Sequence, residues 1–184
     1  MAPPGPLWAP FDVALWDLWA KLQGLPLCLE GSAGIDPQTA ANEAKKAEVD
    51  GYRAYALTGT TSVIDVGVPR AQTDAALAAI GAAREAVAPG FPLLYAGAGP
   101  GPYKHLDALT IGRALDAADY TSFEDPLPAG DALALGQLAA ELDTPVLATV
   151  AGVDAGRLAA QHLAGQTADL VRLRSPPPAA SPMC

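Results

Sequence analysis

The residues of this chain that could do acid–base chemistry are few and lie in short, separate segments. Glu124 and Asp125 are adjacent carboxylates followed by a proline, so they could form an acid site or simply end a strand and turn the chain. Lys104 and His105 follow a segment rich in Pro and Gly. His105 could act as a base there, but a solvated helix start is the favoured interpretation.

Two arginines close the organised part of the chain. Arg172 and Arg174 are two residues apart, and residues with this spacing share one face of a β-strand. The pair could bind an acidic ligand, although lining an exposed strand edge is the simpler interpretation. His162 lies inside an Ala-rich segment and is expected to be structural or exposed.

Composition restricts the class of protein. The chain has 184 residues, a net charge of −9 and 51% hydrophobic residues, which suits one domain with a core of mainly Ala, Leu and Val. The acidic balance argues against a nucleic-acid or membrane-surface partner. No apolar stretch reaches the roughly 18 residues that span a bilayer. Without a signal-peptide pattern or a disulfide framework (Cys28 and Cys184 stand alone), a cytoplasmic location is expected.

The pattern along the chain predicts a central domain at residues 11–175 between Pro-rich segments at 1–10 and 176–184. Residues 11–23 read as an amphipathic helix. After it, short apolar runs alternate with longer Ala-rich segments, which indicates βα units and a parallel sheet. The expected strands are 25–29, 52–57, 91–95, 120–123, 145–150 and 169–173; the expected helices are 37–49, 70–87, 105–117, 131–142 and 154–163.

Six parallel strands permit two α/β architectures, a doubly wound open sheet and an incomplete (β/α) barrel of the TIM type. Periodicity does not separate them. No glycine-rich nucleotide-binding fingerprint follows the first expected strand, so the nucleotide-binding version of the open sheet gains no support.

Five segments, taken together, resemble the barrel domain of the enolase superfamily, in its mandelate racemase/muconate lactonizing enzyme group. They occur in that family's order, and Phe-Glu-Asp-Pro within the fourth is the most specific piece. The segments are ALWDLWAKLQGLP at 14–26, DGYRAYALTG at 50–59, REAV with PGFPLL at 84–94, YTSFEDPLPAGD at 120–131 and LDTPVLATV at 142–150. The resemblance implies an incomplete barrel of about six βα units.

The resemblance also implies a reaction. Members of the family racemise or dehydrate hydroxy acids and acid sugars by removing a proton next to a carboxylate, with Lys as base and three carboxylates holding Mg²⁺. In this chain Ala56 and Thr58 stand at the Lys-x-Lys positions, and Ala96 and Val150 stand at two of the metal carboxylates. Glu124 alone matches a metal ligand, so we expect Mg²⁺ binding to be weak or absent.

These departures lead to three hypotheses for function. The first is a catalytically inactive homologue or fragment, which could bind or assemble with a complete relative. The second is an active lyase or isomerase on a small carboxylate with a rebuilt site, for which Asp125, His105 and Arg174 are possible substrate-side residues. The third is a non-catalytic binding or assembly module. A small carboxylate ligand and homo-oligomerisation are the expected partners, with no nucleic acid and no membrane.

Overall fold

The computed structural model describes residues 29–31, 36–59, 69–97, 103–152 and 154–174. The predicted helix at 11–23, both Pro-rich ends, both cysteines and most of the first expected strand lie outside these ranges.

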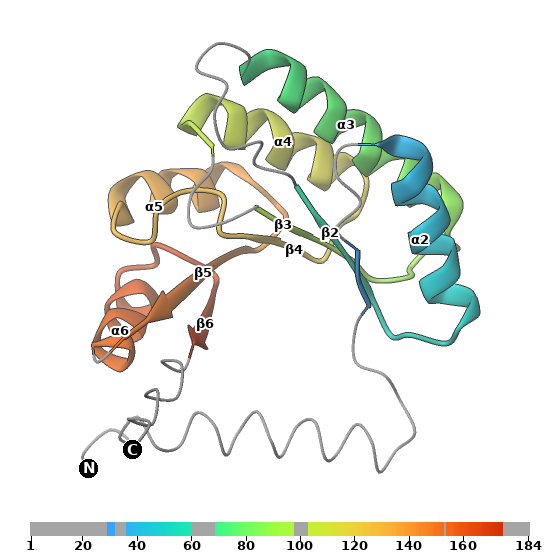
Figure 1. The fold of residues 1–184 in the computed structure, drawn as a ribbon. Coiled ribbons are helices and arrows are strands. Elements are labelled where there is room, and N and C mark those ends of the chain that lie inside the picture. The colour runs from blue at the N-terminus through green and yellow to red at the C-terminus, as the bar shows by residue number, and fades with distance from the viewer. Residues whose placement is uncertain (1–28, 32–35, 60–68, 98–102, 153, 175–184) are drawn as a thin grey trace, which may run out of the picture.

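The described residues form strands and helices in strict alternation (Figure 1). The strands are β1 (Leu29–Gly31), β2 (Tyr55–Thr58), β3 (Leu93–Ala96), β4 (Ser122–Glu124), β5 (Val146–Ala151) and β6 (Leu170–Arg174). The helices are α2 (Pro37–Val49), α3 (Pro69–Ala86), α4 (His105–Ala117), α5 (Ala132–Glu141) and α6 (Ala155–Ala164).

Local capping signals set the helix boundaries. The Asp36 carboxylate accepts a hydrogen bond from the Thr39 backbone N at 2.9 Å, directly before a proline at the first helical position. Asp131 caps α5 in the same way, accepting from the Ala134 N at 3.1 Å. Because these signals are local, each of the five helices begins and ends within one residue of its predicted bounds.

The strands from β2 onward begin one to three residues later than predicted. The apolar runs open with Tyr52, Phe91 and Tyr120, which pack against the core before the strand pairing starts. An apolar run in the sequence indicates which residues are buried, and here the first buried residues of each run come before the first residue of the strand.

The order of the strands decides between the two architectures. The sheet runs β1-β2-β3-β4-β5-β6, and every neighbouring pair is parallel. A doubly wound sheet reverses its order at a switch point, and this one does not. Figure 1 shows the helices gathered on one side of a curved sheet. The fold is an incomplete (β/α) barrel, and the open-sheet alternative is wrong.

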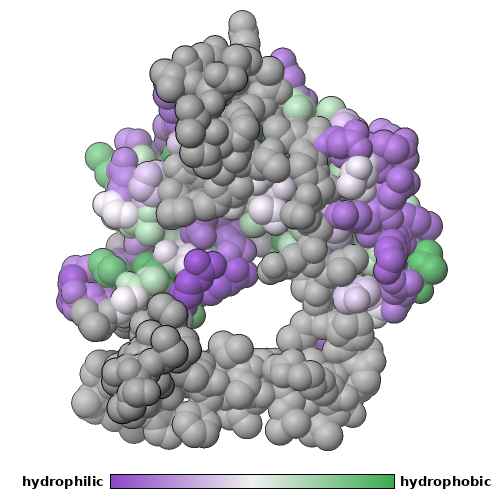
Figure 2. Space-filling view, in the orientation of Figure 1, coloured by the Kyte–Doolittle hydropathy of each residue, from purple (hydrophilic) through white to green (hydrophobic). Residues whose placement is uncertain are grey.

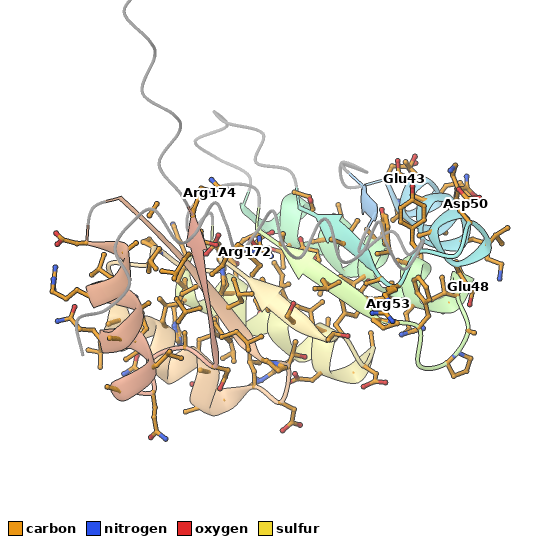
Figure 3. All side chains as sticks on the ribbon, turned by 90° about the horizontal axis from the view of Figure 1, so that it is seen from below. Glu43, Glu48, Asp50, Arg53, Arg172 and Arg174 are labelled. Carbon is orange, nitrogen blue, oxygen red and sulfur yellow. The ribbon has the colours of Figure 1, made fainter. Side chains whose placement is uncertain are left out.

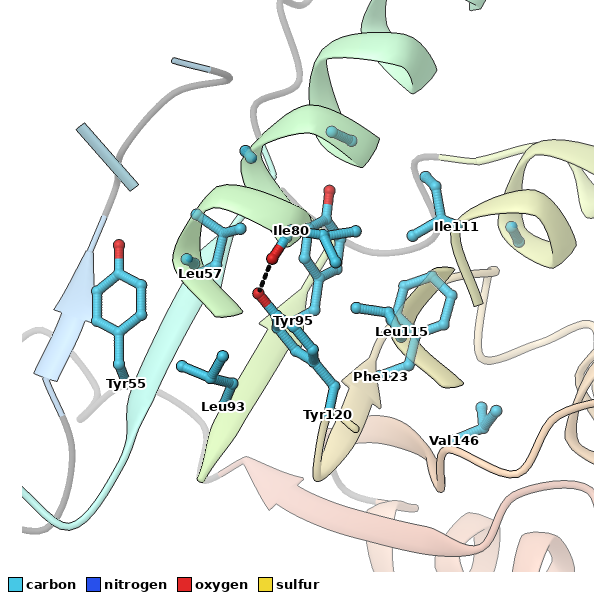
Figure 4. Close-up of a cluster of buried hydrophobic side chains, with 14 of the residues drawn as sticks. Tyr55, Leu57, Ile80, Leu93, Tyr95, Ile111, Leu115, Tyr120, Phe123 and Val146 are labelled. Atoms are coloured by element: carbon cyan, nitrogen blue, oxygen red, sulfur yellow. Dashed lines mark hydrogen bonds between the residues drawn. The ribbon is translucent and has the colours of Figure 1, made fainter. Parts of the chain in front are cut away.

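The core lies between the sheet and its helices (Figure 4). Alternate strand residues point into it, and Tyr95 meets Phe123 edge-on with ring centroids 5.7 Å apart. On α4, a Cβ at Gly112 would lie 2.3 Å from Leu142, so glycine lets that leucine pack against the helix. The largest buried strand side chains are Tyr55, Leu57, Leu93, Tyr95, Phe123 and Val146.

The buried tyrosines face the helices, as strand alternation predicts. The Tyr55 hydroxyl donates to the Glu43 carboxylate at 2.9 Å, and the Tyr95 and Tyr103 hydroxyls lie 2.9 Å apart. Burial raises the pKa of Tyr55 and of Tyr95 far above the ordinary value, so both rings stay neutral. These side chains are packing residues with satisfied hydroxyls.

The outer surface is strongly polar over α2, where Figure 2 shows hydrophilic side chains gathered on the right. Within the described ranges, no helix is both long enough and apolar enough to cross a bilayer.

Candidate functional site

The strand residues that alternate with the core positions form what we call the inner face of the sheet. Backbone register sets their neighbours: Ala96 pairs with Glu124, and Thr149 pairs with Arg172. In β/α barrels, functional side chains gather at the carboxyl ends of the strands, here called the carboxyl edge. Toward that edge the inner face carries Thr58, Ala96, Glu124, Thr149, Arg172 and Arg174.

An ion pair crosses the inner face. The Arg172 Nη1 on β6 donates to the Glu124 Oε1 on β4, reaching over the intervening β5. The Glu124 side chain is only 15% exposed and that of Arg172 is 45% exposed, so the carboxylate lies deeper than the cation. Figure 3 shows Arg172 projecting from β6 toward the middle of the sheet. A charge-assisted bond of this kind is among the stronger hydrogen bonds in proteins.

Asp125 is the residue that ties the end of β4 to β5. Its backbone is left-handed, with φ of 49°, a conformation that Asp tolerates better than most residues. Its Oδ1 accepts from the Thr149 N at 2.6 Å, and its own N donates to the Leu147 O at 2.8 Å. The sequence allowed an acid site or a turn at this acidic pair. For Asp125 the structure favours the turn, because its carboxylate accepts a hydrogen bond from the β5 backbone.

Three buried side-chain atoms have no hydrogen-bond partner in the described part of the chain: the Thr149 Oγ1, the Ser122 Oγ and the His105 Nδ1. An unpaired buried polar atom is unfavourable, and such atoms are uncommon in native proteins. Ser122 and Thr149 belong to the inner face, and sequence reasoning missed both hydroxyls. The available signal was alternation, since Ser122 precedes Glu124 by two residues.

The start of α4 lies beside the same edge. The Tyr103 N donates to the Pro126 O at 3.3 Å, which joins this helix start to the segment after β4. Lys104 is exposed and caps α4 without a side-chain bond, whereas His105 is half-buried. The prediction of a solvated helix start holds for Lys104 and is wrong for the His105 Nδ1, which is buried.

The other histidine has a structural environment. His162 is 4% exposed on α6, and its Nδ1 lies 2.8 Å from the Thr167 Oγ1 at the end of that helix. This agrees with the prediction of a structural role.

The remaining candidate positions lie on three strands, β2, β5 and β6. Ala56 and Thr58 are half-buried on the inner face of β2. Val150 is 2% exposed and follows the buried side of β5, so its side chain points toward the helices and Thr149 occupies the inner face instead. Arg174 is exposed at the end of β6 and forms no ion pair with any described residue.

Comparisons with known proteins agree with this geometry. The sequence model of the enolase C-terminal domain-like family matches residues 39–174, which is most of the chain and runs from the first turn of α2 to the end of β6. The chain belongs to this family. The incomplete barrel is therefore an enolase-type barrel, as the resemblance implies.

The relatives of this enolase-family chain include dehydratases and racemases. It is 31% identical to the L-talarate/galactarate dehydratase of Salmonella typhimurium over 180 residues, covering 91% of this chain and 43% of that enzyme. The chain thus spans less than half the length of this curated relative.

Solved structures match the fold. D-glucarate dehydratase from Agrobacterium tumefaciens, complexed with magnesium, aligns over 81% of this chain and 38% of its own, with a TM-score of 0.67 and 22% identity. A mandelate racemase/muconate lactonizing family protein from Azoarcus sp. EbN1 aligns over 82% and 36%, with a TM-score of 0.64 and 25% identity.

The described residues do not fit the Mg²⁺ that the enolase family implies. Mg²⁺ takes oxygen ligands in octahedral geometry, usually with more than one carboxylate or phosphate oxygen. No group of three or more His, Cys, Asp or Glu that could hold a metal occurs in the described ranges. Glu124, the one matching ligand, is paired with the Arg172 guanidinium. The expectation that Mg²⁺ binds weakly or not at all stays a prediction.

Proposed function

We propose that this chain is a non-catalytic member of the enolase family, which binds a small carboxylate on the inner face without removing its α-proton. The Glu124–Arg172 ion pair carries the proposal. In the family pattern the carboxylate at this position binds a divalent cation. Here it binds a side chain of the same protein.

The positions that the resemblance assigns to the base also support the proposal. Proton abstraction next to a carboxylate needs a group that accepts the proton and a cation that stabilises the resulting charge. Ala56 and Thr58, at the Lys-x-Lys positions, offer no group that ionises near neutral pH. Ala96, directly beside Glu124 in the register, offers no oxygen to a metal.

The test is exchange of the α-proton with solvent. Galactarate, glucarate and mandelate would each be incubated in D₂O with the protein and Mg²⁺, and the α-proton signal followed by NMR. We expect no exchange above the protein-free rate, while a full-length dehydratase relative run alongside exchanges readily. Mg²⁺-dependent exchange that disappears in Glu124→Gln would overturn the proposal.

One observation favours a second candidate, an active lyase or isomerase with a rebuilt site. The His105 Nδ1 is buried and has no partner among the described residues, and α4 begins beside the segment that follows Asp125. A substrate carboxylate or hydroxyl could satisfy that nitrogen, with His105 as base. This candidate requires a turnover of some small carboxylate that falls in both His105→Ala and Glu124→Gln, and an unchanged rate in either variant argues against it.

Association with a complete relative or with a second copy, and a cytoplasmic location, stay predictions from the sequence. Size-exclusion chromatography with light scattering, alone and mixed with a full-length relative, tests the first of these.

A further inference from the structure

Arg172 places a fixed positive charge on the inner face. A guanidinium has five N–H donors in a planar fork that matches two oxygens of a carboxylate. The Nη1 of Arg172 donates to Glu124, and 45% of the side chain is exposed to solvent. The carboxylate of Glu124 therefore orients the guanidinium without using up its donors.

Arg174 adds a second guanidinium at the same edge. It lies two residues further along β6, beyond Arg172 (Figure 3), and has no ion-pair partner among the described residues. A strand rises about 3.3 Å per residue, so the two Cα atoms are about 6.6 Å apart on one face. The two ends of a short dicarboxylate can bridge that spacing.

Thr149 supplies an independent sign that this face takes a ligand. It pairs with Arg172 in the register, and its Oγ1 is buried without a partner in the described ranges. A buried hydroxyl with no hydrogen bond is unfavourable until an acceptor arrives. A ligand oxygen held by Arg172 would lie next to that hydroxyl.

The charges favour an anion over a cation. Glu124 is matched by Arg172, and the Oδ1 of Asp125 accepts a backbone N–H, which leaves Arg174 as the charge without a described partner. A divalent cation would face two guanidinium groups at short range. The chain as a whole has a net charge of −9, so attraction of an anion must come from these local groups and not from the overall field.

We propose that Arg172 is the resident cation of the inner face, and that Arg172, Arg174 and the Thr149 hydroxyl form a metal-independent binding site for a small dicarboxylate. This inference rests on the proposed function, because it says which residues bind the small carboxylate ligand. It replaces a bound metal ion with a side chain that Glu124 keeps in position.

Isothermal titration calorimetry of the full chain in EDTA tests the site, with succinate and galactarate as probes and inorganic phosphate as a second oxyanion. We expect both dicarboxylates to bind, with affinities that do not change when Mg²⁺ replaces EDTA. Phosphate, which has no second end for Arg174, should bind at least tenfold more weakly. Binding that needs Mg²⁺, or equal affinity for phosphate, overturns the proposal.

Variants assign the donors. Arg172→Lys removes the planar fork but keeps the charge, and should weaken dicarboxylate binding at least tenfold. Arg174→Met should weaken succinate binding and leave phosphate binding unchanged. The matched control is Arg157→Met, because Arg157 is an exposed arginine on α6 paired with Asp154 and Gln161. An affinity in Arg172→Lys equal to that of the control refutes the assignment.

The affinity of Glu124→Gln for dicarboxylates distinguishes a Glu124 that positions Arg172 from a Glu124 that binds a metal or a substrate hydroxyl. Gln keeps an acceptor oxygen for the Arg172 guanidinium but removes a negative charge that repels the ligand, so binding should become several-fold tighter. A site in which Glu124 holds a metal or a substrate hydroxyl would instead lose affinity. A melt by circular dichroism confirms that each variant is folded.

The two proposals fail differently. Exchange of an α-proton in D₂O contradicts the proposed function whatever the affinities show. Absence of dicarboxylate binding to a cooperatively folded protein, with no exchange, contradicts this inference and leaves the loss of catalysis standing.

Discussion

The two edges of this sheet use polar residues in opposite ways. At the amino edge, where the strands begin, charged and hydroxyl side chains bond to backbone. The Asp116 Oδ1 accepts from the Thr144 N at 2.6 Å, and the Asp169 Oδ2 accepts from the Val146 N at 2.8 Å. The buried Tyr120 hydroxyl donates to the Ile80 O at 3.1 Å. Each of these bonds joins segments that are more than 20 residues apart in the sequence.

At the carboxyl edge the side chains bond to each other or to nothing described. Glu124 pairs with Arg172, while the Thr149 Oγ1 and the His105 Nδ1 have no described partner. Asp125 is the exception, because its carboxylate holds the β5 backbone. Buried polar groups in native proteins are mostly hydrogen-bonded, so the two unpaired atoms at this edge support the proposed ligand site. The Ser122 Oγ, at the start of β4, is also unpaired among the described residues.

The largest expected difference between the two edges concerns Tyr120. Tyr120→Ala removes a ring that is 4% exposed and should lower the free energy of unfolding by about 3–5 kcal/mol. Arg174→Ala, at the other edge, should change it by less than about 0.5 kcal/mol. Urea denaturation of both variants measures this. Equal losses would mean that the carboxyl edge also serves stability.

Asp116 tests the backbone bonds of the amino edge. Asp116→Ala removes the acceptor of the Thr144 backbone N–H. Because Thr144 is only 3% exposed, the free energy of unfolding should fall by about 1–3 kcal/mol. Asp116→Asn keeps an acceptor oxygen and is the control, with a smaller loss expected. Similar denaturation midpoints for the two variants would show that charge, and not the hydrogen bond, matters at this position.

Thr149 should respond with the opposite sign. Thr149→Val keeps the shape of the side chain and removes an unpaired buried hydroxyl, so stability should rise by about 1 kcal/mol. Thermal unfolding without ligand provides the measurement, with Thr144→Val at the amino edge for comparison. A loss of stability in Thr149→Val would reveal a partner for the hydroxyl and remove the contrast between the edges.

The smallest effect is a pH dependence at the amino edge. Hydrogen bonds from Lys45 and from the Ala88 N hold the pKa of Glu48 below its ordinary value of 4.5. A depressed carboxylate pKa gives stability that is present above the unfolded pKa and is lost as the pH falls through the folded one. Glu48→Gln should therefore melt below the parent protein at pH 7, and the difference in melting temperature should shrink as the pH falls below 4.5. A difference that stays constant or grows as the pH falls contradicts this.

Sequence reasoning succeeded where the signals are local. The Asp36-Pro37 start and the Asp131 cap lie within three residues of the atoms they bond, so helix bounds followed closely. The Glu124–Arg172 pair joins residues 48 apart and depends on the register of three strands, which no local pattern encodes. Arg172 is exposed on β6 at the edge of the described sheet, as predicted, but its pairing with Glu124 was not foreseen. The substrate-side role of Arg174 stays a prediction.

Strand register also explains why the substituted metal positions differ in meaning. Ala96, which the resemblance places at a metal carboxylate, lies beside Glu124 on the inner face and offers that face no oxygen from its side chain. Val150 instead packs toward the helices, and the sequence alignment alone does not reveal this. Val150 therefore aligns with a metal ligand in the sequence but does not lie on the inner face in the structure.

The link that Asp125 forms between β4 and β5 affects how members of this family are identified from sequence. Its left-handed backbone, its bond to Thr149 and the buried Pro126 behind it hold two neighbouring strands together, independently of any reaction. A chain can lose its catalytic groups and still need Phe-Glu-Asp-Pro in order to fold. Similarity in this segment is therefore a record of ancestry and architecture, and a chain identified by it should be assigned a reaction only after its lysines and metal carboxylates have been found.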